Sequence, residues 1–258
     1  MIDTHCHLDV ERFDADRADV IARAQAAGLG GILVPAIRPA TWPTLVELGR
    51  SNAMLRVALG VHPQIVPELV DGEVGDLVKQ IVDSTREAGA LAIAVGECGL
   101  DGATGEHERQ EAIFRAHVRA ARELKLPLVV HVLRAHDVAP RILREENASD
   151  VGGVMHSYSG GAALVPVYRD LGFAFSFAGP VTYPNARRPV EAVRVVPDEL
   201  LLAETDAPDQ APAAHRGQRS EPAYVGDVIA GMATARGTTA AAIAELTTRN
   251  AKARFASW

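Results

Sequence analysis

Cysteine is scarce in this 258-residue chain: only Cys6 and Cys98 occur, and both lie in segments with the pattern of strands. Two such residues do not build a disulfide framework, so we expect reduced thiols. The chain also lacks an apolar run near the roughly 20 residues that a membrane span requires. Its first residues lack the basic and apolar segments of a signal peptide. These absences predict a cytoplasmic protein with no membrane contact.

Lysine is almost absent as well, with residues only at positions 79, 125 and 252. None of them ends a predicted core strand, which argues against the amidohydrolases that use a carboxylated lysine. The formal net charge is −7, and a chain of this charge repels a polyanion unless positive charge gathers locally. Binding along a wide basic surface is therefore excluded, and any role on nucleic acid must be local and catalytic.

The apolar pattern predicts eight short strands, each followed by an amphipathic helix. A glycine-rich phosphate loop after the first strand, which open doubly wound sheets usually carry, is missing. Eight βα units in about 250 residues are typical of a (β/α)8 TIM barrel, here with one domain over residues 1–258. The predicted strands are Ile2–His5, Gly31–Pro35, Leu55–Gly60, Leu91–Glu97, Leu128–His131, Gly153–His156, Phe173–Phe177 and Leu200–Glu204.

The predicted helices fill the intervals between these strands and close the chain after the last one. Histidines at 107, 117, 136 and 215 fall on them or in loops, and we interpret all four as solvated or capping residues. The helical segments are Ala15–Ala27, Trp42–Arg50, Val74–Ala88, His107–Leu124, Val138–Glu146, Ala163–Leu171, Arg188–Val195, Pro222–Arg236 and Thr239–Phe255.

Metal-binding side chains recur where the predicted strands end. His5 and His7 are two residues apart on the first strand, so both point to the same side and are able to grip one cation. Because active sites of barrels form at the carboxyl ends of the strands, the remaining strand-end residues should converge on the same rim. Those residues are His62, Glu97, His131, His156 and Asp206.

These residues belong to motifs that resemble the TatD family of metal-dependent deoxyribonucleases, in that family's order and across the whole chain. The motifs are Asp-Thr-His-Cys-His-Leu-Asp at 3–9, Gly-Val-His-Pro at 60–63, Gly-Glu-Cys-Gly-Leu-Asp at 96–101, His131, His-Ser-Tyr-Ser-Gly at 156–160 and Glu-Thr-Asp-Ala-Pro at 204–208. The resemblance implies an amidohydrolase-type barrel, two divalent metal ions (Zn, Mg or Mn) and hydrolysis of phosphodiester bonds in DNA.

Carried over position by position, the resemblance makes His5, His7 and Asp206 ligands of one metal. Glu97 then bridges to a second metal, which His131 and His156 hold. Asp206 is the candidate proton acceptor for the attacking water, so Asp206 and Glu97 are the predicted catalytic residues.

Four further residues are predicted to bind substrate. His62 lies at a neighbouring strand end, within reach of a phosphate oxygen, and Arg219 follows the last strand. Tyr158 is a candidate to stack on a base. After His131 the family commonly has Ser and Arg, whereas this chain has Val132 and Leu133, so we expect Arg134 to supply the phosphate contact. Gly102 also replaces a frequent aromatic residue.

Three functions remain open at the level of sequence. The preferred one is a 3′ to 5′ exodeoxyribonuclease that acts on DNA ends as a monomer, without an obligate protein partner. The second uses the same metals on an ester or amide, as an aminoacyl-tRNA deacylase does, because a water activated between two cations attacks carbonyl and phosphoryl groups alike. The third is a non-catalytic scaffold with structural metals, which ligands around an open rim disfavour.

Overall fold

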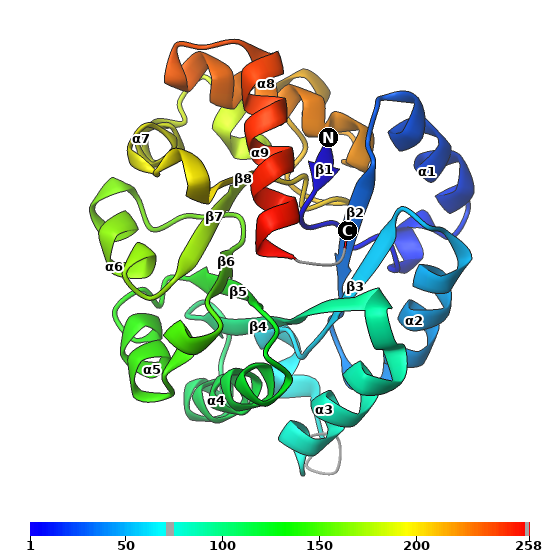
Figure 1. Cartoon of the computed structure of the whole chain (residues 1–258), viewed down its shortest axis with the longest axis vertical. Helices are drawn as coiled ribbons and strands as arrows, with labels where there is room; N and C mark the ends of the chain where they lie inside the picture. The colour runs from blue at the N-terminus through cyan, green and yellow to red at the C-terminus, as the bar shows by residue number, and fades with distance from the viewer. Residues whose placement is uncertain (71–74, 256–257) are drawn as a thin grey trace.

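Eight parallel strands form one sheet in the computed structural model, which describes residues 1–70, 75–255 and 258. The strands pair in chain order, from β1 beside β2 through to β7 beside β8. They are β1 (Ile2–Asp3), β2 (Gly31–Pro35), β3 (Leu55–Leu59), β4 (Ala92–Asp101), β5 (Leu128–Leu133), β6 (Gly153–Met155), β7 (Phe173–Phe177) and β8 (Leu201–Ala203). The sheet curls into the predicted (β/α)8 barrel, with helices around its outside (Figure 1).

Helices follow the strands in the predicted alternation, and two more close the chain. Short 3₁₀ turns precede several of them, such as Ala162–Leu164 before α6. They are α1 (Arg17–Ala26), α2 (Trp42–Ser51), α3 (Leu77–Ala88), α4 (His107–Leu124), α5 (Ala139–Glu145), α6 (Val165–Arg169), α7 (Arg187–Val195), α8 (Val225–Arg236) and α9 (Ala240–Arg254). The predicted start of the third helix at Val74 lies outside the described residues.

All eight predicted strands are present, but the first ends at Asp3, before His5, and β4 and β5 continue past their predicted ends. β4 runs on from Glu97 to Asp101 and pairs with β5 along this extension, where Gly99 lies beside His131 and Asp101 beside Leu133. The extension therefore holds the carboxylate of Glu97 inside a paired strand, where its position is fixed, instead of in a loop.

The inside of the barrel is packed with small and branched side chains from every strand, two of them from β4. At the amino-terminal end of the strands this core continues to Ala251 of α9 and to Phe255, directly after that helix. Asn250 fastens the helix because its side-chain amide donates hydrogen bonds to the carbonyl oxygens of Asp198 and Leu201, at 2.6 and 2.9 Å. Figure 1 shows α9 lying across this end of the barrel. The polar strand-end residues lie at the opposite end of the barrel, formed by the carboxyl ends of the strands.

The barrel closes between β8 and β1 at the carboxyl ends of these strands. The backbone N–H of Asp206 donates to the carbonyl oxygen of His5 at 2.9 Å, and that of His7 donates to Ala207 at 2.7 Å. An isolated parallel β-bridge between the backbones of Cys6 and Ala207 lies at the same junction. Closure of the fold therefore brings Asp206 beside the two histidines of the first strand, about two hundred residues away in sequence.

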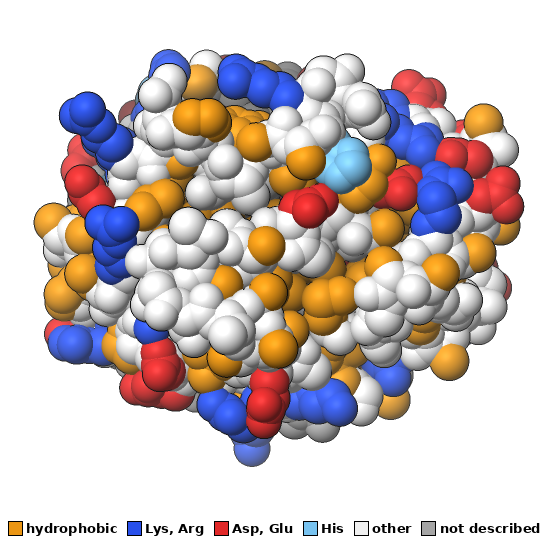
Figure 2. Space-filling view, turned by 90° about the horizontal axis from the view of Figure 1, so that it is seen from above, with side chains coloured by type: hydrophobic (Ala, Val, Ile, Leu, Met, Phe, Trp, Pro, Cys, Tyr) orange, Lys and Arg blue, Asp and Glu red, His pale blue; other side chains and the backbone are white. Residues whose placement is uncertain are grey.

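The face shown in Figure 2 carries Lys and Arg side chains close to Asp and Glu, without a continuous basic stripe. This mixture agrees with the negative net charge of the chain. None of the helices formed by the described residues combines the length and apolar character needed to cross a bilayer.

Candidate metal centre

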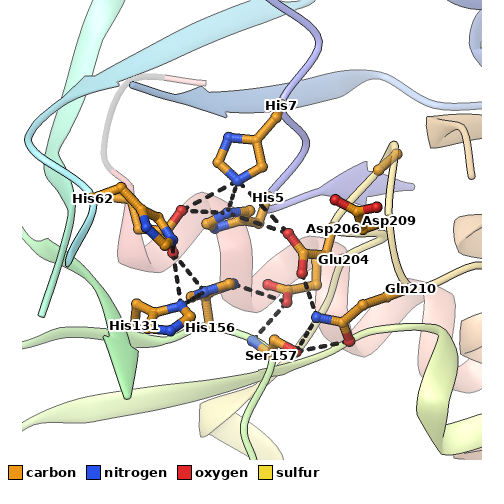
Figure 3. A network of polar contacts seen from close by, with 12 residues as sticks. His5, His7, His62, His131, His156, Ser157, Glu204, Asp206, Asp209 and Gln210 are labelled. Atoms are coloured by element: carbon orange, nitrogen blue, oxygen red, sulfur yellow. Dashed lines mark hydrogen bonds and ion pairs between the residues drawn. The ribbon is translucent and has the colours of Figure 1, made fainter. Parts of the chain in front are cut away.

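Five histidines surround one buried carboxylate at the carboxyl ends of the strands (Figure 3). The carboxylate is that of Glu97, which is 0% exposed. Each histidine places a ring nitrogen within 3.3 Å of one of its oxygens. The histidines are His5, His7, His62, His131 and His156.

The two oxygens of Glu97 face two different groups of histidines. Oε2 lies 3.0 Å from His5 Nε2 and 3.3 Å from His7 Nε2. Oε1 lies 2.8 Å from Nε2 of His156 and 3.1 Å from Nδ1 of His131. Potential metal ligands therefore gather on both sides of one carboxylate. This is the division that the sequence motifs imply.

His62 lies closer to this cluster than its predicted role in substrate binding requires. Its Nε2 is 2.9 Å from Glu97 Oε1, while its Nδ1 accepts a hydrogen bond from the backbone N–H of Gln64 at 3.1 Å. With Glu97 and His131 it forms one of the triads able to hold a cation. The ring is therefore aimed at the position where a metal or a phosphate oxygen would lie.

Glycines let the backbone approach Glu97 closely. A Cβ atom at Gly60 would lie 2.5 Å from the carbonyl oxygen of Glu97, so β3 reaches β4 only because that side chain is missing. Gly99 has a φ of +134°, and a Cβ atom there would lie 2.0 Å from the carbonyl oxygen of His131. Both positions require glycine for the strands to hold the cluster together.

Asp206 completes the side of the cluster formed by the first strand. Its Oδ1 lies 3.7 Å from His5 Nε2 and 3.8 Å from His7 Nε2. Its other oxygen accepts a hydrogen bond from the side-chain amide of Gln210, which also donates to Ser157 Oγ at 2.7 Å. Asp206 is thus held in place from the side away from the histidines.

Glu204 and Ser157 join this network, although sequence reasoning gave neither residue a role. Glu204 Oε1 accepts the backbone N–H of Ser157 at 2.6 Å and lies 3.4 Å from His156 Nδ1. A carboxylate on the second nitrogen of a ligating histidine orients the ring and raises its basicity. The motif at 204–208 contains Glu204, so its presence beside Asp206 was the available signal.

Burial and charge shift the proton affinities of this cluster in opposite directions. Burial, with the charge of His156, lowers the pKa of His5 to about 4. Burial lowers the pKa of His7, but the adjacent negative charge of Glu97 outweighs it and raises the pKa to about 9. Burial opposes ionisation of Glu97, yet the neighbouring histidines hold its pKa well below the usual range. Burial raises the pKa of Asp206 to about 6. Glu97 is therefore the fixed negative charge of the cluster.

Buried polar atoms of the cluster that lack a hydrogen-bond partner are suitable ligands for cations. Glu97 Oε2 is buried and accepts no hydrogen bond, although the Nε2 atoms of His5 and His7 stand beside it. Those two nitrogens also lie 3.2 Å from each other, and at most one proton can sit between them. Imidazole and carboxylate ligands suit zinc and other divalent transition ions. A cation held by these groups would satisfy them.

Two of the predicted substrate contacts lie away from the centre or are already engaged. The guanidinium of Arg219 donates two hydrogen bonds of 2.7 Å to Asp16, so it is not available for phosphate. Tyr158 is 3% exposed, packs its ring against Phe175 and donates its hydroxyl to Gly161 at 2.9 Å. Its ring packs beneath β7, and Tyr158 also lines a cavity beside His131 and His156.

Arg134 is exposed and lines a separate small cavity with Asp101 and Gly102. None of the five histidines of the cluster lines that cavity. The carbonyl oxygen of Arg134 would lie 2.5 Å from a Cβ atom at Gly102. A larger residue at position 102, as in the resembling family, therefore does not fit this backbone.

The interpretation of His117 as a solvated residue is wrong. Its ring is 0% exposed, Nε2 accepts the backbone N–H of Val61 at 2.9 Å, and Nδ1 contacts the carbonyl oxygen of Ile113 at 2.8 Å. It therefore joins α4 to the segment that carries His62. His136 is half-buried instead of solvated, with Nδ1 2.8 Å from the hydroxyl oxygen of Tyr168.

A cavity of about 350 Å³ opens beside His131 and His156, and sequence reasoning did not predict it. Its walls are mostly apolar, and the only Lys or Arg among its lining residues is Arg188, at the start of α7. Leu133, at the position where the resembling family commonly has arginine, is one of its wall residues. The cavity is the space next to the cluster into which part of a substrate fits.

The barrel and its cluster of histidines and carboxylates define a metal-dependent hydrolase. The chain belongs to the TatD-related DNase family, whose model matches residues 2–256. It is 34% identical over 257 residues to YabD of Bacillus subtilis (strain 168), with 99% of this chain and 98% of that protein aligned. It is 36% identical over 255 residues to YcfH of Escherichia coli (strain K12), with 97% and 93% aligned. Both relatives are named as uncharacterized metal-dependent hydrolases.

A solved structure agrees with this assignment. The crystal structure of YjjV, a TatD homolog from Escherichia coli K12, superposes with a TM-score of 0.91 at 30% sequence identity. The match covers 99% of this chain and 98% of that one. The same barrel therefore extends over essentially the whole length of both proteins.

Proposed function

We propose that this protein is a two-metal phosphodiesterase that removes nucleotides from the 3′ ends of DNA. The observation that carries the proposal is the division of ligands about Glu97, whose two oxygens face separate groups of histidines. A pair of metals on either side of one carboxylate is the arrangement of enzymes that displace a phosphoryl substituent in line. The family's description as a DNase supports DNA as the substrate.

The residues take distinct roles in this proposal. His5, His7 and Asp206 would hold one divalent ion and His131 and His156 the other, with the Glu97 carboxylate between the two groups of ligands. The ions, when bound, activate water and neutralise the phosphate. Asp206 accepts the proton of the attacking water, because its carboxylate stands at the edge of the cluster with Gln210 fixing its far oxygen.

His62 and the charge of the chain bear on how the substrate is bound. The Nε2 atom of His62 points into the cluster and is placed to donate to a phosphate oxygen. The net charge of −7 directs DNA binding to the cations of the site and away from the general surface. We further propose a single domain over residues 1–258 that acts as a cytoplasmic monomer without an obligate protein partner.

The test measures release of nucleotides from short single-stranded DNA by metal-free protein to which Zn²⁺, Mg²⁺ or Mn²⁺ is returned. We expect at least one ion to restore cleavage from the 3′ end, and Asp206→Ala to abolish it. Equal rates in Asp206→Ala and the wild type refute the proposal. A panel that includes carboxylic esters and aminoacyl-tRNA separates it from the ester or amide alternative, which a clear preference for those substrates supports.

A further inference from the structure

The cavity beside His131 and His156 has the size and shape of a compartment for one unit of a substrate. Its volume of about 350 Å³ lies at the low end of the roughly 300–1,000 Å³ of small-molecule sites. A double helix is far too wide to enter it, whereas one nucleoside fits. The cavity touches the metal centre directly because both histidines form part of its wall.

The walls of this cavity suit a flat, largely apolar ring. Most of its surface is apolar, and apart from the two histidines and Arg188 the polar side chains among its lining residues are Ser157, Tyr158, Ser159 and Gln210. Such surfaces bind a nucleobase by burying its faces, while the few polar groups fix its edge. The apolar part is formed by residues of three segments, among them Val132, Leu133, Phe177, Ala178, Pro180 and Pro189.

Arg188 is the one Lys or Arg among the residues that line the cavity. No Asp or Glu is among the lining residues, so the arginine is not neutralised there. Arg188 is exposed, and within the described part of the chain it forms neither an ion pair nor a hydrogen bond. Most other arginines differ in this respect, as in the pair of Arg219 with Asp16. A free guanidinium at the rim of an apolar cavity is a site for a phosphate group.

We propose that this cavity holds the terminal nucleotide of a DNA strand and that Arg188 binds a second phosphate on it, apart from the phosphate at the metal centre. The inference rests on the proposed function and adds a substrate preference. The protein should favour an end whose terminal nucleotide carries a 3′-phosphate over an end with a free hydroxyl. This preference follows from three features of the cavity: the metal ligands in its wall, its apolar surface and the unpaired Arg188.

The test compares two ligands of the metal-loaded protein by calorimetry, thymidine 3′,5′-bisphosphate and thymidine 5′-monophosphate. A charge-assisted contact to the second phosphate should make the bisphosphate bind roughly 10- to 100-fold more tightly. Arg188→Ala should abolish the difference and Arg188→Lys should restore part of it. Arg187→Ala is the matched control, because Arg187 is the adjacent exposed arginine of α7 and is not among the cavity's lining residues, so it should retain the difference.

A second variant tests the cavity itself. Ala178→Leu narrows the wall and should weaken binding of both nucleotides while leaving the metal content unchanged. Equal affinities of wild type and Arg188→Ala for the bisphosphate overturn the inference, even if DNA is cleaved as proposed. If the bisphosphate preference depends on Arg188 but no phosphodiester is hydrolysed, the proposed function fails and the binding site stands. The two failures are therefore distinguishable.

Discussion

Glu97→Gln is the substitution that most directly probes the metal centre. It keeps the size of the side chain and removes its charge from a position that is 0% exposed and has histidine nitrogens within 3.3 Å on both sides. Removing one member of a buried set of opposite charges costs about 3–5 kcal/mol. Converted at about 1.4 kcal/mol for each factor of ten, this predicts metal binding weaker by roughly 140- to 3,700-fold.

The assay for this prediction is competition for Zn²⁺ or Mn²⁺ against a chelating dye, performed on metal-free protein at pH 7.5. Circular dichroism and thermal unfolding show whether the variant remains folded. Glu245→Gln, which removes an exposed carboxylate of α9, is the matched control and should bind metal like the wild type. A Glu97→Gln variant that is folded and retains wild-type affinity would show that the carboxylate does not bridge the metals.

Three other predictions concern the supports of the centre. Gly99→Ala should lower the free energy of unfolding, measured in urea, by more than about 1–3 kcal/mol, because a positive φ is combined with a backbone clash. Gly226→Ala is the control: a Cβ atom there meets open space, so the free energy of unfolding should not fall. Gln210→Leu should lower activity about 10- to 100-fold by releasing Asp206, with little change in unfolding free energy, and unchanged activity contradicts this role. Burial lowers the pKa of His117 to about 4 from 6.5. The neutral ring of His117 therefore contributes fully to the free energy of unfolding above pH 6.5. This contribution, roughly 3 kcal/mol in total, is lost as the pH falls toward 4. Unfolding measured from pH 8 to 4 should show less acid sensitivity in His117→Gln, and parallel curves for variant and wild type count against the argument.

The strand-end residues show what the pattern of the sequence was sufficient to predict. Strand alternation predicted that His5 and His7 share a face; β1 ends at Asp3, so the pair lies directly after the strand, where the bridge of Cys6 to Ala207 continues its pairing. Parallel strands bring their carboxyl ends to one rim. The structure places both histidines, Glu97, His131 and Asp206 together for these reasons. The order of strands in the barrel also follows from the repetition of βα units along the chain.

Side chains whose partners lie in distant segments were not predictable in this way. Arg219 was a candidate for phosphate until folding placed it against Asp16, and His117 was an outer-helix residue until α4 packed it under Val61. Tyr158 likewise turned inward beneath β7. Gln210 meets Ser157 only because the loop after β8 lies beside the segment after β6.

The sequence by itself determined the kind of protein, a parallel barrel with a ring of imidazole and carboxylate ligands, because periodicity and strand ends are local properties of the chain. Only the tertiary structure decided that the oxygens of Glu97 separate two groups of ligands and that Arg188 stands free beside an apolar cavity. The reason is that packing and barrel closure set the distances between segments that are far apart in sequence, and no spacing along the chain encodes those distances.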